Sequence, residues 1–176
     1  MNGLHLFIDN SNIFIEAQRI ARNKFYYDDE LVVRLRICYG SLLEVIRQSR
    51  TLKETVLVGS RPPQNDALWE KLKELQVEPR IFDRSPYSGK ENRVDAELTN
   101  AIRDTLEDNP TPSIIAIVAG DQDYVPTLKR CVKKNWKVEI YFWDQASSEL
   151  KSLPNTNFIS LDEYFEKITF REKSRL

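Results

Sequence analysis

Five short hydrophobic runs alternate along the chain with longer stretches in which apolar residues recur every three or four positions. The short runs have the length and character of buried β-strands and cover 4–8, 55–58, 78–82, 114–118 and 138–143. The stretches with helical spacing cover 12–22, 30–49, 65–76, 94–107 and 124–135. Strands that alternate with helices form right-handed βαβ units. The pattern therefore predicts an α/β fold, a three-layer α/β/α sandwich with a mainly parallel sheet of about five strands.

The chain has 176 residues, of which 41% are hydrophobic, and this fits one domain with a sizeable core. We expect that domain to span residues 1–168 and to end in a short helix over 161–168. Residues 169–176 read as a charged, flexible C-terminal tail. The least regular internal stretch, DRSPYSGKENR over 83–93, is predicted to be an exposed loop.

Charge and composition exclude several classes of protein. The 26 basic and 27 acidic residues nearly cancel, so contacts with nucleic acid must come from local clusters of Lys and Arg. Two widely separated cysteines argue against a zinc knuckle, a CxxC redox pair and a disulfide framework. The longest wholly apolar run, 114–119, is too short for a signal peptide or a membrane span. We expect a soluble intracellular protein, cytoplasmic or nuclear.

Acidic residues directly follow two of the predicted strands. Asp9 ends the first, in LHLFIDNSN. Asp121 and Asp123 follow the fourth, in IIAIVAGDQDYVP, where Gly120 permits a tight turn. Ligands of open parallel sheets bind beyond the carboxyl ends of the strands. Asp95 would add a fourth carboxylate from the first turn of the helix that follows the irregular loop.

Each of these carboxylates, taken alone, also fits a capping role. Asp9 fits an Asx-turn, Asp121 fits a helix N-cap, and Asp95 fits a capping box that starts at Asn92. Together they would repel by ~4 kcal/mol per pair at ~4 Å and an effective dielectric of ~20, a cost that a cation removes. Their places at strand ends make Asp9 and Asp121 the stronger ligand candidates, and Asp95 and Asp123 the weaker.

The ligand types indicate a hard cation. Oxygen-only ligands, in a chain with two cysteines and one histidine, favour Mg²⁺ or Mn²⁺ over zinc or copper. Magnesium keeps several water ligands, which suits hydrolysis. A single histidine, His5, also excludes a metal-independent ribonuclease mechanism that uses two histidines of one chain as acid and base.

Three segments resemble the NYN family of PIN-like nucleases. They are IDNSN after the first strand, KENRVDAEL around the third acidic segment, and AGDQDYVPTLK after the fourth strand. The resemblance covers residues 3 to 160 and implies a PIN-like, Rossmann-like fold with Mg²⁺- or Mn²⁺-dependent endoribonuclease activity. The family's acidic metal ligands and its nearby asparagine match five candidate catalytic residues: Asp9, Asp95, Asp121, Asp123 and Asn12.

Two departures from the family pattern affect the metal count. Ala119 stands where relatives usually carry Ser, and Asn100 and Ala101 stand where many carry a further acid. We therefore expect one ion. In the resulting hypothesis the ion lowers the pKa of a bound water and offsets charge on the scissile phosphate, while Asn12 orients a water or a phosphate oxygen.

Candidate RNA contacts lie in the irregular loop and at the rim of the sheet. The loop offers cations for phosphates and one ring for base stacking, namely Arg84, Tyr87, Lys90 and Arg93. Arg61 follows the second strand and is a further substrate contact at the rim. The polar side of the predicted helix 124–135 is assigned to solvent; its cations are Lys129, Arg130, Lys133 and Lys134. The near-zero net charge indicates weak intrinsic RNA affinity and leaves room for a protein partner that delivers substrate.

Two other functions fit parts of the sequence. The main alternative is an RNA-binding or partner-binding module of the same fold with little or no activity. A haloacid dehalogenase-type phosphatase is more distant, because it needs a second Asp two residues after the nucleophile, where this chain has Ser11. Neither GxGxxG nor GxxxxGK[ST] is present, so no nucleotide cofactor is expected.

Overall fold

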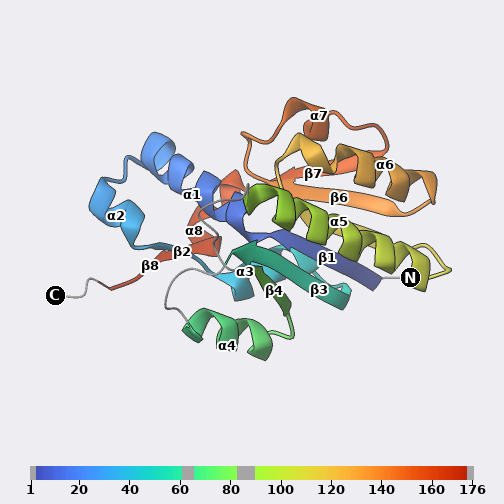
Figure 1. Ribbon diagram of the computed structural model, residues 1–176. Helices are drawn as coiled ribbons and strands as arrows, with labels where there is room; N and C mark the ends of the chain where they lie inside the picture. The colour runs from blue at the N-terminus through green and yellow to red at the C-terminus, as the bar shows by residue number, and fades with distance from the viewer. Residues whose placement is uncertain (1–2, 61–65, 83–89, 174–176) are drawn as a thin grey trace.

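Six parallel strands form the central sheet in the computed structural model, which describes residues 3–60, 66–82 and 90–173 (Figure 1). The strands are β1 (Gly3–Asp9), β3 (Thr51–Ser60), β4 (Glu78–Phe82), β5 (Ile114–Val118), β6 (Lys137–Phe142) and β7 (Thr156–Ser160). Their order is β4-β3-β1-β5-β6-β7, and every neighbouring pair is parallel. Counted along the chain, this is the doubly wound order 3-2-1-4-5-6. The predicted fold is confirmed, with six strands in the sheet where five were expected.

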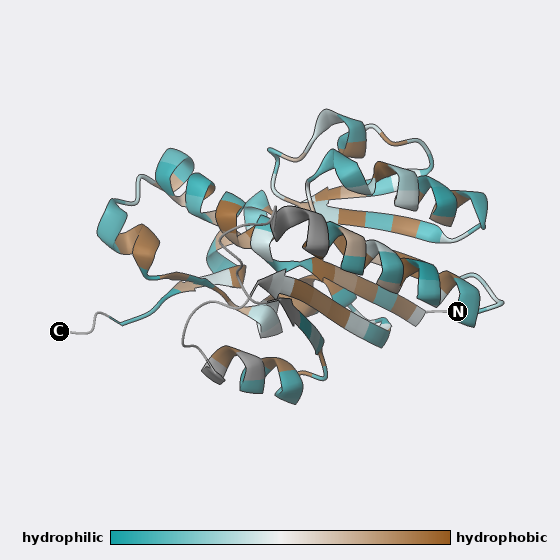
Figure 2. Cartoon of the chain, in the orientation of Figure 1, coloured by the Kyte–Doolittle hydropathy of each residue, from teal (hydrophilic) through white to brown (hydrophobic). Residues whose placement is uncertain are grey.

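Helices cover both faces of this sheet. One face packs against α1 (Asn10–Phe25), α3 (Tyr39–Arg47) and α4 (Asp66–Glu74). The other packs against α5 (Lys90–Asp108), α6 (Val125–Lys133) and the short α7 (Ser148–Lys151). Within β1, Leu6 and Ile8 join the first core and Phe7 joins the second, as expected for a strand buried on both sides. Figure 2 shows largely brown central strands beneath helices that carry teal on their outer sides.

Two smaller strands extend the fold beyond the sheet. The predicted helix 30–49 is divided into α2 (Asp29–Val33), β2 (Leu35–Ile37) and α3. β8 (Thr169–Arg171) pairs antiparallel with β2, so the first three residues of the expected flexible tail form a strand. The helix expected over 161–168 consists of a 3₁₀ turn, η2 (Asp162–Tyr164), and α8 (Phe165–Ile168). Within the described ranges, no helix is both long and apolar enough to span a membrane.

Candidate metal centre

β1 and β5 are neighbours in the sheet and end at the same edge. The strand order runs in opposite directions from this pair, with β3 beyond β1 and β6 beyond β5. Such a switch point is where ligands of doubly wound sheets bind. Asp9 ends β1. Asp121 and Asp123 follow β5: Asp121 directly precedes the 3₁₀ turn η1 (Gln122–Tyr124), and Asp123 lies within it. Both acidic segments that follow strands therefore meet at the switch point.

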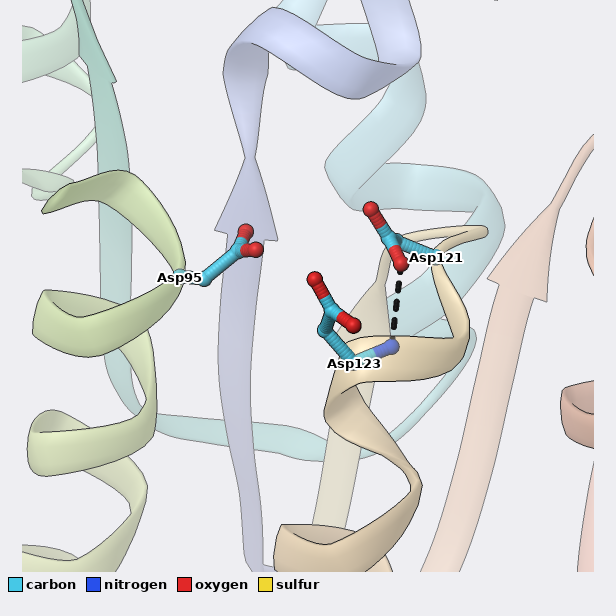
Figure 3. A group of neighbouring side chains, drawn as sticks. All are labelled: Asp95, Asp121 and Asp123. Atoms are coloured by element: carbon cyan, nitrogen blue, oxygen red, sulfur yellow. Dashed lines mark hydrogen bonds between the residues drawn. The ribbon is translucent and has the colours of Figure 1, made fainter. Parts of the chain in front are cut away.

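Three carboxylates converge there and form what we call the acidic cluster. One carboxylate oxygen each from Asp95, Asp121 and Asp123 lies within 4.8 Å of the others. Asp95 and Asp123 point towards one another across the end of β1 (Figure 3). α5 begins at Lys90, so Asp95 lies in the second turn of that helix and not in the first turn, where the sequence placed it. A capping box therefore does not account for Asp95.

Asp121 combines a place in the cluster with a capping role. Its Oδ1 accepts a hydrogen bond from the backbone N–H of Asp123 at 2.9 Å, which makes it the N-cap of η1. This bond fixes the Asp121 carboxylate beside that of Asp123. The capping role expected of Asp121 is thus present and does not compete with its place among the three carboxylates.

Asp9 is buried at the end of β1, with 3% of its surface exposed. Its Oδ1 accepts from the backbone N–H of Asn12 at 3.0 Å, so Asp9 is the N-cap of α1. Its Oδ2 accepts from the hydroxyl of Tyr124 at 2.8 Å. The sequence expected Asp9 to be one of four converging ligands. In the structure Asp9 is joined through Tyr124 to Asp95, one of the three acids of the cluster, and its role as a fourth ligand stays a prediction.

Tyr124 is the central residue of the site that the sequence reasoning missed. It is fully buried, and its hydroxyl lies 2.8 Å from Asp9 Oδ2 and 3.0 Å from Asp95 Oδ1. A phenol has one proton and donates it to one carboxylate at a time. Burial, followed by the negative charges of Asp9 and Asp95, raises the pKa of the Tyr124 hydroxyl. A buried tyrosine needs a polar partner, and this requirement was the available signal next to two acids in GDQDY.

Asn12 joins the ends of the two central strands. Its Oδ1 accepts a hydrogen bond from the Gly120 N–H at 2.8 Å, while its backbone N–H binds Asp9. The expectation was that Asn12 orients a water or a phosphate oxygen. Its side-chain oxygen holds the segment that leads from β5 to Asp121, and the expected contact of Asn12 with a water or a phosphate oxygen stays a prediction.

A glycine is needed at position 120 because the Phe142 ring packs closely against its backbone, and not because the backbone has a positive φ there. A Cβ atom at this position would lie 2.2 Å from two ring carbons of Phe142, which ends β6. No described glycine has a positive φ, so left-handed backbone freedom is not used here. The glycine lets β6 and the start of the acidic turn pack directly against each other.

The environment of Asp95 disfavours its charged form. Burial is the largest cause that raises its pKa, the carboxylates of Asp9, Asp121 and Asp123 act in the same direction, and the Tyr124 hydrogen bond opposes them, so that the pKa lies at about 6. Neighbouring carboxylates repel by ~4 kcal/mol per pair at ~4 Å and an effective dielectric of ~20. A divalent cation would remove this repulsion. Because all three ligands of the cluster are carboxylates, the residues present fit a hard cation such as Mg²⁺ or Mn²⁺.

The predicted substrate contacts are not placed by the structure. Arg61, Arg84 and Tyr87 lie outside the described residues. Lys90 and Arg93 belong to the first turn of α5, but their side chains also lie outside the described part.

Comparison with known proteins agrees with this architecture. No curated protein gives a significant match. A crystal structure of a protein of unknown function from Vibrio parahaemolyticus has a TM-score of 0.70 and 17% sequence identity, with 92% of this chain and 94% of that chain covered. At this identity the likeness shows the fold alone. The family model of the NYN domain matches residues 4–162, nearly the whole chain. The protein therefore belongs to the NYN domain family of PIN-like nucleases.

Proposed function

We propose that this protein is an endoribonuclease that hydrolyses RNA phosphodiester bonds with a bound Mg²⁺ or Mn²⁺. The observation that carries the proposal is the acidic cluster, three carboxylates within 4.8 Å at the switch point of the sheet. Membership of a PIN-like nuclease family supports a hydrolytic role for that cluster.

Each residue of the site has a role in this proposal. Asp95, Asp121 and Asp123 hold the cation. When bound, the cation lowers the pKa of a water ligand and offsets charge on the scissile phosphate. Asp9 anchors Tyr124, whose hydroxyl is also within hydrogen-bonding distance of Asp95 and orients it. Asn12 fixes the turn that carries Asp121 through its bond to Gly120.

Substrate contacts are proposed on the amino side of α5 and after β3. The sequence places cations and one aromatic ring there, as expected for phosphate contacts and base stacking. The proposed substrate-binding residues are Arg61, Arg84, Tyr87, Lys90 and Arg93.

A cleavage assay with metal titration tests the function. The protein is incubated with end-labelled single-stranded and hairpin RNAs over a range of Mg²⁺ and Mn²⁺ concentrations, and with EDTA. We expect internal cleavage that requires the metal and that falls by about 100-fold or more in Asp123→Asn, because one ligand is lost. The matched control is Asp104→Asn, which removes an exposed acid from the outer side of α5 and should cleave like the wild type.

Two results would overturn the proposal: undiminished cleavage in EDTA, or wild-type cleavage by a folded Asp123→Asn variant. The alternative, an RNA-binding module that does not cleave, is favoured by Asn100, an exposed amide where many family members carry an acid. RNA retention without any metal-dependent product, equal in wild type and Asp123→Asn, would select that alternative.

A further inference from the structure

Helix α6 carries four cations on its outer side, and we call this surface the α6 cationic face. All four side chains are exposed; they are Lys129, Arg130, Lys133 and, at the helix C-cap, Lys134. The opposite side of the helix is buried through Thr127, Leu128 and Cys131. The packing of α6 onto the sheet therefore needs none of the four cations.

Among the described residues, no ion pair neutralises the charge of this face. None of the four cations forms an ion pair with another described residue, whereas Arg34 pairs with Glu30 and Arg80 pairs with Glu97. The whole chain has a formal net charge of −1, so a local surplus of four positive charges on one helix is a marked departure from the average. A surface of this kind attracts a polyanion.

The neighbouring helix α5 has a surplus of negative charge on its exposed side. Asp104, Glu107 and Asp108 are exposed there, with Arg103 as an exposed cation among them. α5 and α6 lie side by side on the same face of the sheet (Figure 1). An anionic chain that passes over this layer is therefore attracted to α6 and repelled by α5. These charges restrict it to the α6 cationic face.

The α6 cationic face extends away from the acidic cluster. α6 begins at Val125, directly after the 3₁₀ turn that contains Asp123. At ~1.5 Å per residue, Lys129 lies about 6 Å and Lys133 about 12 Å from the first residue of α6 along the helix axis. Cations in a last helical turn also offset the helix dipole, but that effect falls off within the turn and does not require Lys129. An RNA strand bound at the acidic cluster would reach the first two cations, Lys129 and Arg130, and then Lys133 and Lys134, within a few nucleotides.

We propose that the α6 cationic face binds the backbone phosphates of single-stranded RNA on one side of the scissile bond. The inference deepens the proposed nuclease function and rests on it for the identity of the substrate. The convex outer side of one helix contacts a single backbone, and Lys and Arg side chains that contact phosphates supply affinity and register without reading the base sequence. The face is thus an extension of the substrate site and not part of the metal centre.

The test measures binding without cleavage. A fluorescein-labelled 20-nucleotide oligouridine is titrated with Asp123→Asn protein, and the anisotropy is followed at several KCl concentrations. In this background, Lys129→Gln with Lys133→Gln should weaken binding about 10-fold at low salt. The slope of log affinity against log salt should fall by roughly 1.4, about 0.7 for each lost phosphate contact. The matched control, Lys71→Gln with Lys73→Gln, removes two exposed cations from α4 on the other face and should leave both values unchanged.

Equal affinity and slope in the two double variants would overturn the inference, as would the absence of measurable RNA binding at low salt. In the wild-type background, the α6 variant should raise KM and leave kcat unchanged, because the metal centre is intact. The inference and the proposed function fail separately. Metal-dependent cleavage with no effect of the α6 variant contradicts only the inference. RNA binding that depends on α6, without cleavage by the wild type, contradicts only the nuclease.

Discussion

The carboxylate of Asp95 lies closer to neutrality than an ordinary aspartate. Burial and, to a smaller extent, the neighbouring acids raise its pKa to about 6. The folded chain therefore binds a proton at Asp95 at pH values where the unfolded chain does not. Stability then falls as pH rises from about 4 to about 6, and it stays reduced above that range. In the metal-free protein, the charged form of Asp95 destabilises the fold at neutral pH.

Asp95→Asn removes this cost, so we expect the metal-free variant to be more stable than the wild type at pH 7. The gain should be about 1 to 2 kcal/mol, after allowance for the partial exposure of the side chain. It should shrink towards zero at pH 4, where the wild-type carboxyl is protonated in the folded chain and partly protonated in the unfolded chain. Urea unfolding in EDTA at pH 4, 5, 6 and 7 measures it. A constant difference between the two proteins across this range would contradict the assigned pKa.

The sequence predicted the acidic residues of the site but not their grouping. Asp9 and Asp121 were the stronger candidates because they end strands, and both prove to cap the element that follows. Asp95 was the weaker candidate because its helix seemed to start at Asn92. The helix begins two residues earlier, at Lys90, within the stretch that was predicted to be an irregular loop. This earlier start takes Asp95 out of the capping position. The bridge formed by Tyr124 depends on three distant segments, which no local pattern contains.

At the level of elements, long periodic segments were predicted well and short paired ones were not. β2 is only three residues long, and its partner β8 lies more than a hundred residues later in the chain. The apolar spacing on either side of β2 continues a helical period, so nothing local marks the interruption. β7 is an edge strand whose sequence, TNFIS, is half polar and partly exposed. Such strands give a weak alternation signal, and only the pairing with β6 defines this one.

The contact between β6 and the acidic turn can be tested at Gly120. Gly120→Ala places a methyl group against the Phe142 ring, and the overlap should lower the free energy of unfolding by about 1–3 kcal/mol. The displaced turn should also weaken metal binding at Asp121. The control is Gly40→Ala in α3, where a Cβ meets nothing within 4 Å, and this variant should be as stable as the wild type or slightly more. Equal urea midpoints for wild type and Gly120→Ala would show that the ring moves aside freely.

At the scale of the whole molecule, the strand order determines where the acids meet. Asp9 and Asp121 are far apart in sequence and become neighbours only because β1 and β5 pair at the centre of the sheet. α5 crosses from β4 back to β5 and brings Asp95 to the same edge. Doubly wound topology was predictable from the alternation of strands and helices. The meeting point of the acids followed from the switch-point rule once the strand order was known.

Because the acidic cluster exists only when the sheet is folded, a cation that binds it should stabilise the folded chain over the unfolded one. At a metal concentration 100 times the dissociation constant, the gain is about 2.7 kcal/mol. For a chain of this size, that corresponds to a rise of roughly 5–10 °C in Tm. We expect this rise in differential scanning fluorimetry with Mg²⁺ or Mn²⁺, and a rise of the same size in Asp104→Asn. Asp123→Asn should lose most of it, since one of three carboxylates is gone. A Tm independent of both metals in the wild type would exclude the cluster as a metal site, whatever the outcome of cleavage assays.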